Sequence, residues 1–182
     1  MIFMIFLSVF FLPFAHLETI LREDWGGEYP ARRAPMTTPV QYFVIHHTAT
    51  GRCFNRRACS KIVRTIQNYH MKHRGWSDIG YNFLVGEDGN VYEGRGWRTV
   101  GAHAPGYNSK SIGLSFIGNF SSKKPNQKAL TAAKELIRYA INHNKLKMNY
   151  KLIGHRQTKM TDCPGTALYK EISTWPNWVK RL

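Results

Sequence analysis

Cys163 is the residue whose type and position point most directly to chemistry. The chain has three cysteines, and two of them, Cys53 and Cys59, are close enough in sequence to close a small disulfide on their own. That leaves a thiol eight residues after His155 in a chain with features of a secreted protein. Since an exposed free thiol is a hazard in an oxidising compartment, a lone cysteine there usually has a function. Thiolate and imidazole are preferred ligands of zinc, so we predict a zinc site.

Histidines are the candidates for the other zinc ligands. They are His46, His47, His70, His73, His103, His143 and His155. Because consecutive side chains of a strand point to opposite faces, only one of the neighbours His46 and His47 can reach a given metal. The spacing of His155 and Cys163 allows one loop to fold both residues onto one ion. We interpret His143, near the end of an expected helix, as solvent-exposed.

The elements that must position these residues alternate between strands and helices. Runs of β-branched and aromatic residues and turn signals predict strands over residues 40–46, 81–85, 91–93, 112–117 and 150–153. Apolar residues at helical spacing and the residues after Pro164-Gly165 predict helices over residues 57–73, 127–143 and 166–173. Strands and helices that interleave around one sheet indicate an α/β fold.

Length and charge limit the class of protein. A chain of 182 residues suits one domain with a sizeable core. The net charge of +15 predicts attraction to anionic polymers such as nucleic acid, anionic lipid or bacterial cell wall. The basic residues are scattered along the sequence and no zinc-finger or RNP motif is present, so we do not expect nucleic-acid binding as the main function.

The first residues have the composition of a secretory signal peptide. Residues 1–15 carry no charge and are nearly all apolar, but a membrane-spanning helix needs about 20 residues. We therefore expect a signal peptide over residues 1–16, a mature domain over 17–182 and an extracellular location. No basic residue precedes the apolar run and Pro13-Phe14-Ala15 is a poor cleavage site, so an uncleaved anchor is the alternative. No other apolar stretch is long enough to cross a membrane.

Several short segments closely resemble the peptidoglycan recognition proteins, a family that also resembles phage-type amidases. The segments are Val44-Ile45-His46-His47-Thr48, Trp76-Ser77-Asp78-Ile79-Gly80-Tyr81-Asn82-Phe83, Val91-Tyr92-Glu93-Gly94-Arg95-Gly96-Trp97, Gly101-Ala102-His103, Gly154-His155-Arg156 and Asp162-Cys163-Pro164-Gly165. The likeness runs from about residue 20 to residue 178, and the motifs together are highly specific. It implies a single α/β domain with a central mixed sheet flanked by helices. It also implies that Cys53 and Cys59 form the small disulfide of the family.

The resemblance implies that His46, His155 and Cys163 hold zinc, with water in the fourth position. Three protein ligands and an open position are the catalytic pattern, whereas a structural site is closed by four ligands. The resemblance also implies that Tyr81 and Thr161 line the metal. Members that only bind wall fragments usually lack the cysteine, so this chain resembles a working N-acetylmuramoyl-L-alanine amidase. A non-catalytic receptor or sensor that binds peptidoglycan is the alternative.

The general base is not identified by the sequence. Glu93 and Asp162 are the nearest carboxylates in motif terms, and we interpret Asp162 as a residue that caps or braces the cysteine loop. Zinc-bound hydroxide needs little help from a base.

The resemblance further implies a groove above the sheet that binds glycan and peptide. By motif position its contact residues are His47, Thr48, His70, Arg74, Gly75, Trp76, Tyr81, Arg95, His103 and Asn108. Relatives that prefer meso-diaminopimelate peptides carry Gly-Trp and Arg at the positions of Gly75, Trp76 and Arg95. A guanidinium can grip the carboxylate that lysine lacks through two parallel hydrogen bonds, whereas the alternative for Arg95 is a solvated hairpin arginine. We therefore expect bacterial peptidoglycan as the partner of a monomeric, secreted protein of innate immunity.

Overall fold

The computed structural model describes residues 19–182. The expected signal peptide over residues 1–16 lies outside the described residues. Across the part of the chain that is described, none of the helices combines the length and apolar character needed to cross a membrane.

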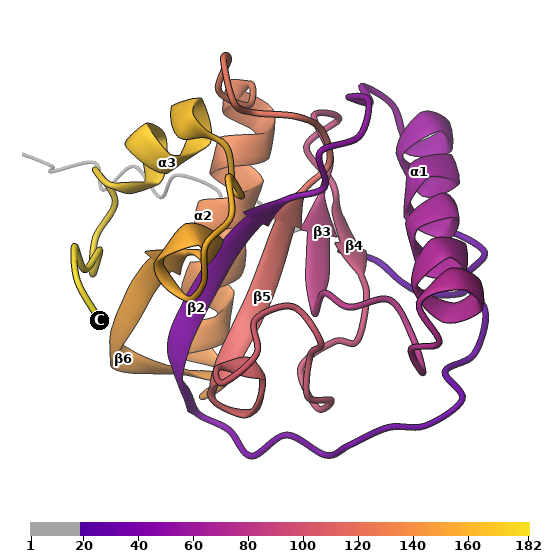
Figure 1. The fold of residues 1–182 in the computed structure, drawn as a ribbon, viewed down its shortest axis with the longest axis horizontal. Coiled ribbons are helices and arrows are strands. Elements are labelled where there is room, and N and C mark those ends of the chain that lie inside the picture. Colours follow the sequence, from indigo (N-terminus) through magenta and orange to yellow (C-terminus); the bar gives the residue numbers. More distant parts are fainter. Residues whose placement is uncertain (1–18) are drawn as a thin grey trace, which may run out of the picture.

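A mixed six-stranded sheet forms the centre of the molecule (Figure 1). Its strands, in spatial order, are β1 (Thr19–Ile20), β4 (Val91–Glu93), β3 (Phe83–Val85), β5 (Ser111–Phe116), β2 (Val40–His47) and β6 (Leu146–Gly154). Strands β3 and β4 form an antiparallel hairpin, and the other neighbours pair in parallel. The mixed sheet of one α/β domain is therefore confirmed.

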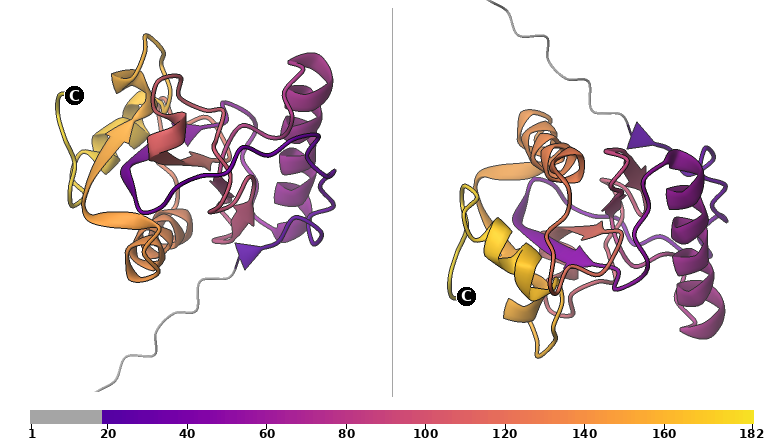
Figure 2. Two further views of the ribbon diagram at one scale, coloured as in Figure 1. Left: turned by 90° about the horizontal axis from the view of Figure 1, so that it is seen from below. Right: turned by 90° about the horizontal axis from the view of Figure 1, so that it is seen from above.

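Three α-helices flank this sheet: α1 (Arg56–Asn68), α2 (Gln127–Asn142) and α3 (Thr166–Ile172). Figures 1 and 2 show α2 lying across one face of the sheet and α1 beside the β3–β4 hairpin. Asparagine caps start both long helices, because Asn55 Oδ1 accepts from Ala58 N and Asn126 Oδ1 accepts from Ala129 N. Each cap of this kind stabilises a helix by about 1 kcal/mol.

Alternation along the strands divides the core into two packed layers. Phe83 and Val85 of β3 belong to the cluster that contains the apolar face of α2, whereas Leu84 belongs to the cluster that contains α1. The same alternation on β2 sends Phe43 and Ile45 toward α2. It leaves Val44 and His46 on the opposite face. That opposite face, at the carboxyl ends of β2 and β6, is where the predicted ligands lie.

The first helix ends differently from the prediction. The sequence predicts one helix over residues 57–73, but the α-helix stops at Asn68 and a π-helical turn follows over Tyr69–His73. Gly75 then adopts a positive φ of 67°, which glycine tolerates without steric cost, and Trp76 N–H bonds back to His70 O at 2.9 Å. The turn brings the rings of His70 and Trp76 to 4.6 Å between centroids.

Two strand predictions also need correction. Strand β6 begins at Leu146 rather than at residue 150, because three consecutive exposed residues, Lys147, Met148 and Asn149, hide the strand pattern in its first half. The two-residue strand β1 is too short to be seen in the sequence. The predicted disulfide is present between Cys53 and Cys59.

Candidate metal centre and its groove

Strand register brings the two histidines predicted as metal ligands together. Ile45 on β2 is paired with Gly154 on β6, so the residues that follow them, His46 and His155, come side by side. Their ring centroids lie 4.4 Å apart. Cys163 arrives from the loop that precedes α3, and the ligand atoms of the three residues all lie within 4.8 Å of one another.

The donor geometry fits zinc. His46 Nδ1 lies 3.7 Å from Cys163 Sγ. A tetrahedral zinc ion with Zn–N of about 2.1 Å and Zn–S of about 2.3 Å separates the two donors by about 3.6 Å. In addition, Nε2 of His155 is buried and has no hydrogen-bond partner among the described residues. Buried polar atoms are normally paired, and a metal ion would satisfy this one.

The pKa values of the two histidines also favour the binding of a cation. Burial, followed by repulsion from Lys159, lowers the pKa of His155 to about 4, and burial holds the pKa of His46 well below its ordinary value. Both imidazoles are therefore neutral at physiological pH, as metal binding requires. Burial raises the pKa of the Cys163 thiol to about 12, so its deprotonation depends on a nearby positive charge such as a metal ion. The backbone N–H of His47 already donates to Cys163 Sγ at 3.4 Å.

Backbone hydrogen bonds fix the loop that carries the cysteine. Arg156 N–H donates to Cys163 O at 2.9 Å, and Cys163 N–H donates to Thr161 Oγ1 at 3.3 Å. Asp162 braces the loop through its carbonyl oxygen, which accepts from Gly165 N–H at 2.7 Å. Gly165 has a φ of 88° and its α-carbon faces the backbone of Phe120, where a side chain would clash. Thr161 and Asp162 thus hold the ligand loop in shape.

Tyr81 lies against the candidate metal centre. Its ring centroid is 5.4 Å from that of His46, and both residues line one cavity. Burial, with a smaller effect from Cys163, raises the pKa of Tyr81 to about 12. The phenol therefore keeps its proton at physiological pH and remains a hydrogen-bond donor.

His103 lies behind His46 and contacts it directly. His103 Nδ1 is 3.0 Å from His46 Nε2, and His103 is only 6% exposed. Asn108 Oδ1 accepts from the backbone N–H groups of His103 and Ala104 at 2.9 and 2.8 Å. Both His103 and Asn108 are predicted substrate contacts, but the contacts seen here are with the protein itself.

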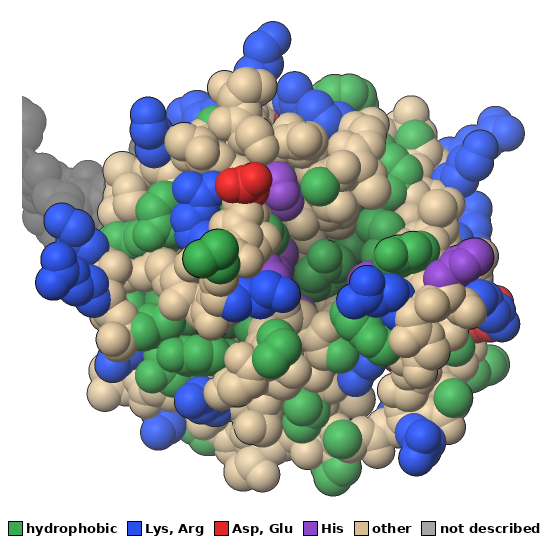
Figure 3. Space-filling model, in the orientation of Figure 1, with side chains coloured by type: hydrophobic (Ala, Val, Ile, Leu, Met, Phe, Trp, Pro, Cys, Tyr) green, Lys and Arg blue, Asp and Glu red, His purple; other side chains and the backbone are tan. Residues whose placement is uncertain are grey.

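A cavity of about 230 Å³ opens above these residues. Its lining is His46, His70, Arg74, Trp76, Tyr81, Ala102, His103, Pro105, His155 and Lys159. Figure 3 shows histidine side chains in a hollow near the centre of this face, with lysine and arginine side chains around it. The lining thus contains two predicted metal ligands and five of the ten predicted groove residues. The other five do not line it; they are His47, Thr48, Gly75, Arg95 and Asn108. Lys159 was not predicted, although its place between His155 and Cys163 was a usable signal.

Two predicted contacts point away from this cavity. His47 Nδ1 accepts from Phe120 N–H at 3.2 Å, and Thr48 Oγ1 accepts from Gly118 N–H at 2.9 Å. Both side chains fasten the loop after β5. His47 faces away from His46, as the strand alternation predicts. Contact of His47 and Thr48 with a substrate stays a prediction.

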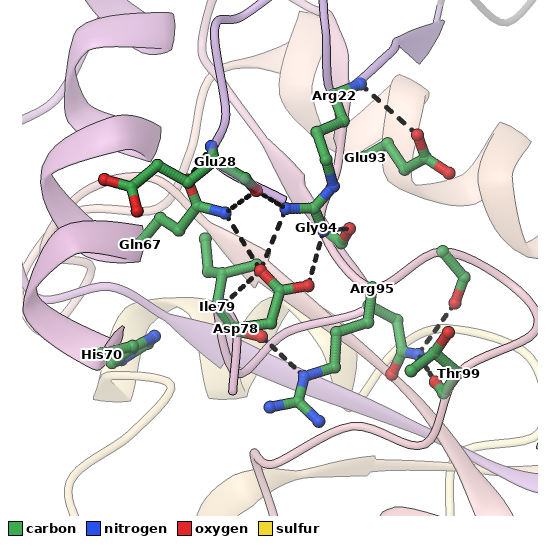
Figure 4. Close-up of polar contacts among 12 residues, drawn as sticks. Arg22, Glu28, Gln67, His70, Asp78, Ile79, Glu93, Gly94, Arg95 and Thr99 are labelled. Carbon is green, nitrogen blue, oxygen red and sulfur yellow. Dashed lines mark hydrogen bonds and ion pairs between the residues drawn. The ribbon is translucent and has the colours of Figure 1, made fainter. Parts of the chain in front are cut away.

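A buried network holds the segment from Asp78 to Gly80 beside the groove (Figure 4). Arg22 makes two hydrogen bonds to the carboxylate of Asp78, at 2.6 and 3.0 Å, and Gln67 Nε2 donates to Asp78 Oδ1 at 3.0 Å. The side chains of Arg22 and Asp78 are 9% and 3% exposed. Asp78 Oδ1 also accepts from the backbone N–H of Ile79 at 2.7 Å, so the buried carboxylate ties this segment to Arg22 and Gln67.

This segment positions two predicted groove residues. Gly80 N–H donates to His70 Nδ1 at 3.0 Å. Arg95 Nε donates to Ile79 O at 2.7 Å (Figure 4). Arg95 Nη1 also donates to Val100 O at 2.8 Å. Two carbonyl groups therefore hold Arg95, which is not a freely solvated hairpin arginine. No acceptor for its Nη2 group is found among the described residues.

Comparisons with known proteins agree with this geometry. The model of the N-acetylmuramoyl-L-alanine amidase family matches residues 36–166. Peptidoglycan-recognition protein SC2 of Drosophila melanogaster is 46% identical over 177 residues, which cover 96% of each chain. Peptidoglycan-recognition protein 1 of Holotrichia diomphalia is 46% identical over 162 residues, which cover 89% of this chain and 82% of the relative.

Solved structures give the same result. Drosophila PGRP-LB has a TM-score of 0.88 and 41% sequence identity, and the match covers 90% of this chain and 96% of that one. Peptidoglycan recognition protein LE, solved with tracheal cytotoxin, a monomeric diaminopimelic acid-type peptidoglycan, has a TM-score of 0.88 and 44% identity. That match covers 88% of this chain and 95% of the other.

Proposed function

This chain belongs to the N-acetylmuramoyl-L-alanine amidase family and, within it, to the peptidoglycan-recognition proteins, and from this we propose that it is a zinc-dependent amidase of bacterial peptidoglycan. The observation that carries the proposal is the convergence of His46, His155 and Cys163, whose ligand atoms lie within 4.8 Å of one another, beside an open cavity that His46 and His155 line. Its target is the amide between the lactyl group of N-acetylmuramic acid and the L-alanine of the stem peptide. The Cys53–Cys59 disulfide supports action outside the cell. The similarity to peptidoglycan-recognition proteins supports a role in defence against bacteria.

The residues around the cavity have different roles in the proposed hydrolysis. Bound zinc would polarise the carbonyl of the substrate amide and would lower the pKa of a water molecule toward about 7. Tyr81, which keeps its proton, donates a hydrogen bond to the oxygen that gains negative charge during attack. Lys159 places a positive charge in the same lining. Thr161 acts indirectly, because its hydroxyl holds the backbone of Cys163.

No carboxylate takes part in this arrangement. The described residues that line the cavity include no aspartate or glutamate. Glu93 Oε2 instead accepts from Arg22 N–H at 3.4 Å, and Asp162 braces its loop through the main chain. Neither of the two carboxylates considered from sequence is therefore assigned as the general base.

We assign the peptide preference to Arg95, Gly75 and Trp76. The Nη2 group of Arg95, which has no acceptor among the residues that the structure describes, is available to the second carboxylate of meso-diaminopimelate, which lysine lacks. Recognition protein LE, solved with a diaminopimelic acid-type ligand, supports this choice. Gly75 is exposed, and a β-carbon built on it would have no heavy atom of the described part of the chain within 4 Å, so it leaves room beside the Trp76 ring.

The decisive experiment offers the zinc-loaded protein two muropeptides that differ only in diaminopimelate or lysine, with and without chelator. Mass spectrometry should show release of the stem peptide, faster for diaminopimelate and abolished by chelator. Cys163→Ser should remove hydrolysis and keep muropeptide binding, because the cysteine holds the metal and not the peptide. If the zinc-loaded wild-type protein binds both ligands and cleaves neither, it is a receptor and the amidase proposal fails.

A further inference from the structure

The contact between His103 and His46 is not explained by a role of His103 in substrate binding. We infer that His103 is a positioning residue, whose Nδ1 accepts a hydrogen bond from His46 Nε2 and so aims His46 Nδ1 at the metal. The inference rests on the proposed function, since it presupposes that His46 binds zinc. The two ring nitrogens are 3.0 Å apart, and the rings meet edge to face with an interplanar angle of 84°.

Proton positions follow from this geometry. Nδ1 of His46 is the nitrogen that faces Cys163 Sγ, so it must be free of hydrogen to bind a metal. The single hydrogen of the neutral imidazole is then on Nε2, and Nε2 is the donor to His103. His103 Nδ1 must accept, which places the hydrogen of His103 on its Nε2. That nitrogen faces Ser111 Oγ at 3.5 Å.

The imidazole of His103 packs closely against two glycines. A Cβ atom on Gly113 would lie 2.5 Å from His103 Cδ2, and one on Gly101 would meet the same atom. The ring therefore lies against two stretches of backbone that only glycine leaves open. Asn108 fixes the backbone of His103 from the other side. A side chain held this firmly suits an orienting role better than an adaptable contact with a ligand.

An orienting partner of this kind has a measurable effect on metal binding. Metal-binding histidines almost always donate their second N–H to a carboxylate, a carbonyl or water, and loss of that partner costs about 10–100-fold in metal affinity. Here the acceptor is another imidazole, which adds no negative charge to the site. His103 therefore fixes the tautomer and ring orientation of His46 without a second anion beside Cys163.

Paired variants separate orientation from simple packing. In His103→Asn the amide oxygen can take the place of Nδ1 as an acceptor, whereas His103→Leu has no acceptor. Competition with a chromophoric chelator should show zinc affinity about 10–100-fold lower in His103→Leu and close to wild type in His103→Asn. His143→Leu removes an exposed histidine beside Tyr139 and should leave zinc affinity unchanged. Far-UV circular dichroism of each metal-free protein checks that it is folded.

A measurement on the wild-type protein needs no variant. Long-range proton–nitrogen correlation spectra of the zinc-loaded protein should show hydrogen on Nε2 of His46 and on Nε2 of His103. Hydrogen on Nδ1 of His103 would overturn the inference, as would equal zinc affinity in His103→Leu and the wild type. A wild-type protein that binds no zinc would instead refute the proposed function, so the two failures are distinguishable.

Discussion

Removal of the charge on Asp78 should destabilise the protein far more than removal of an exposed carboxylate. Asp78→Asn keeps the shape of the side chain, but it leaves the guanidinium of Arg22 buried without its counter-ion. It also places an amide where Arg22, Gln67 and the backbone N–H of Ile79 all donate. Loss of one partner from a buried ion pair costs about 3–5 kcal/mol, so we expect the free energy of unfolding to fall by about that amount.

The matched control is Glu28→Gln. Glu28 pairs with Lys72 at 2.8 Å, but the two side chains are 47% and 60% exposed, and surface pairs contribute about 0–1 kcal/mol. Urea denaturation with chelator present gives both values without a contribution from bound metal. If Asp78→Asn loses no more stability than Glu28→Gln, the buried pair does not hold the segment and our account of the network is wrong.

Three further predictions concern the groove. Tyr81→Phe should lower kcat by about 10²–10³-fold with little change in KM, and steady-state kinetics that show unchanged kcat would remove the phenol from the mechanism. Arg95→Ala should bring the affinities for diaminopimelate and lysine muropeptides together in calorimetry, and an unchanged ratio would contradict its assigned role. Burial, with smaller effects from Arg74 and Arg95, lowers the pKa of His70 to about 4 in the folded protein. As pH falls below about 6.5, His70 is therefore protonated in the unfolded chain before it is protonated in the folded protein. Stability should decline from about pH 6.5 toward pH 4, and His70→Gln should make that decline shallower in urea titrations.

The sequence was informative where chemistry depends on a residue type at a short spacing. Cys163 and His155 are carried by one loop, and the family resemblance adds His46 at the end of a clearly patterned strand, so the grouping of these three potential ligands was predictable in outline. The same holds for β2, β3, β4 and β5, whose apolar residues alternate or run together. Strand β6 was only partly predicted, because exposed side chains interrupt its apolar pattern.

Contacts between distant segments were not predictable. Arg22 and Asp78 are 56 residues apart in sequence, and nothing local marks either as a buried partner of the other. The same reason explains why the contact of His103 with His46 was not predicted, since it depends on the packing of a loop against β2 and β5. The π-helical turn after α1 depends on how Gly75 reverses the chain, which residue periodicity does not report.

The residues proposed for hydrolysis and those proposed for recognition are held by different parts of this fold. The candidate metal ligands come from the ends of β2 and β6 and from the cysteine loop, whereas His70 and Arg95 are held by the segment that Asp78 anchors. Loss of Cys163 should therefore abolish cleavage and spare muropeptide affinity. Asp78→Asn, at a temperature where it remains folded, should weaken muropeptide affinity and spare zinc affinity. If both variants lose both properties together, the two supports are coupled and this division of the site is wrong.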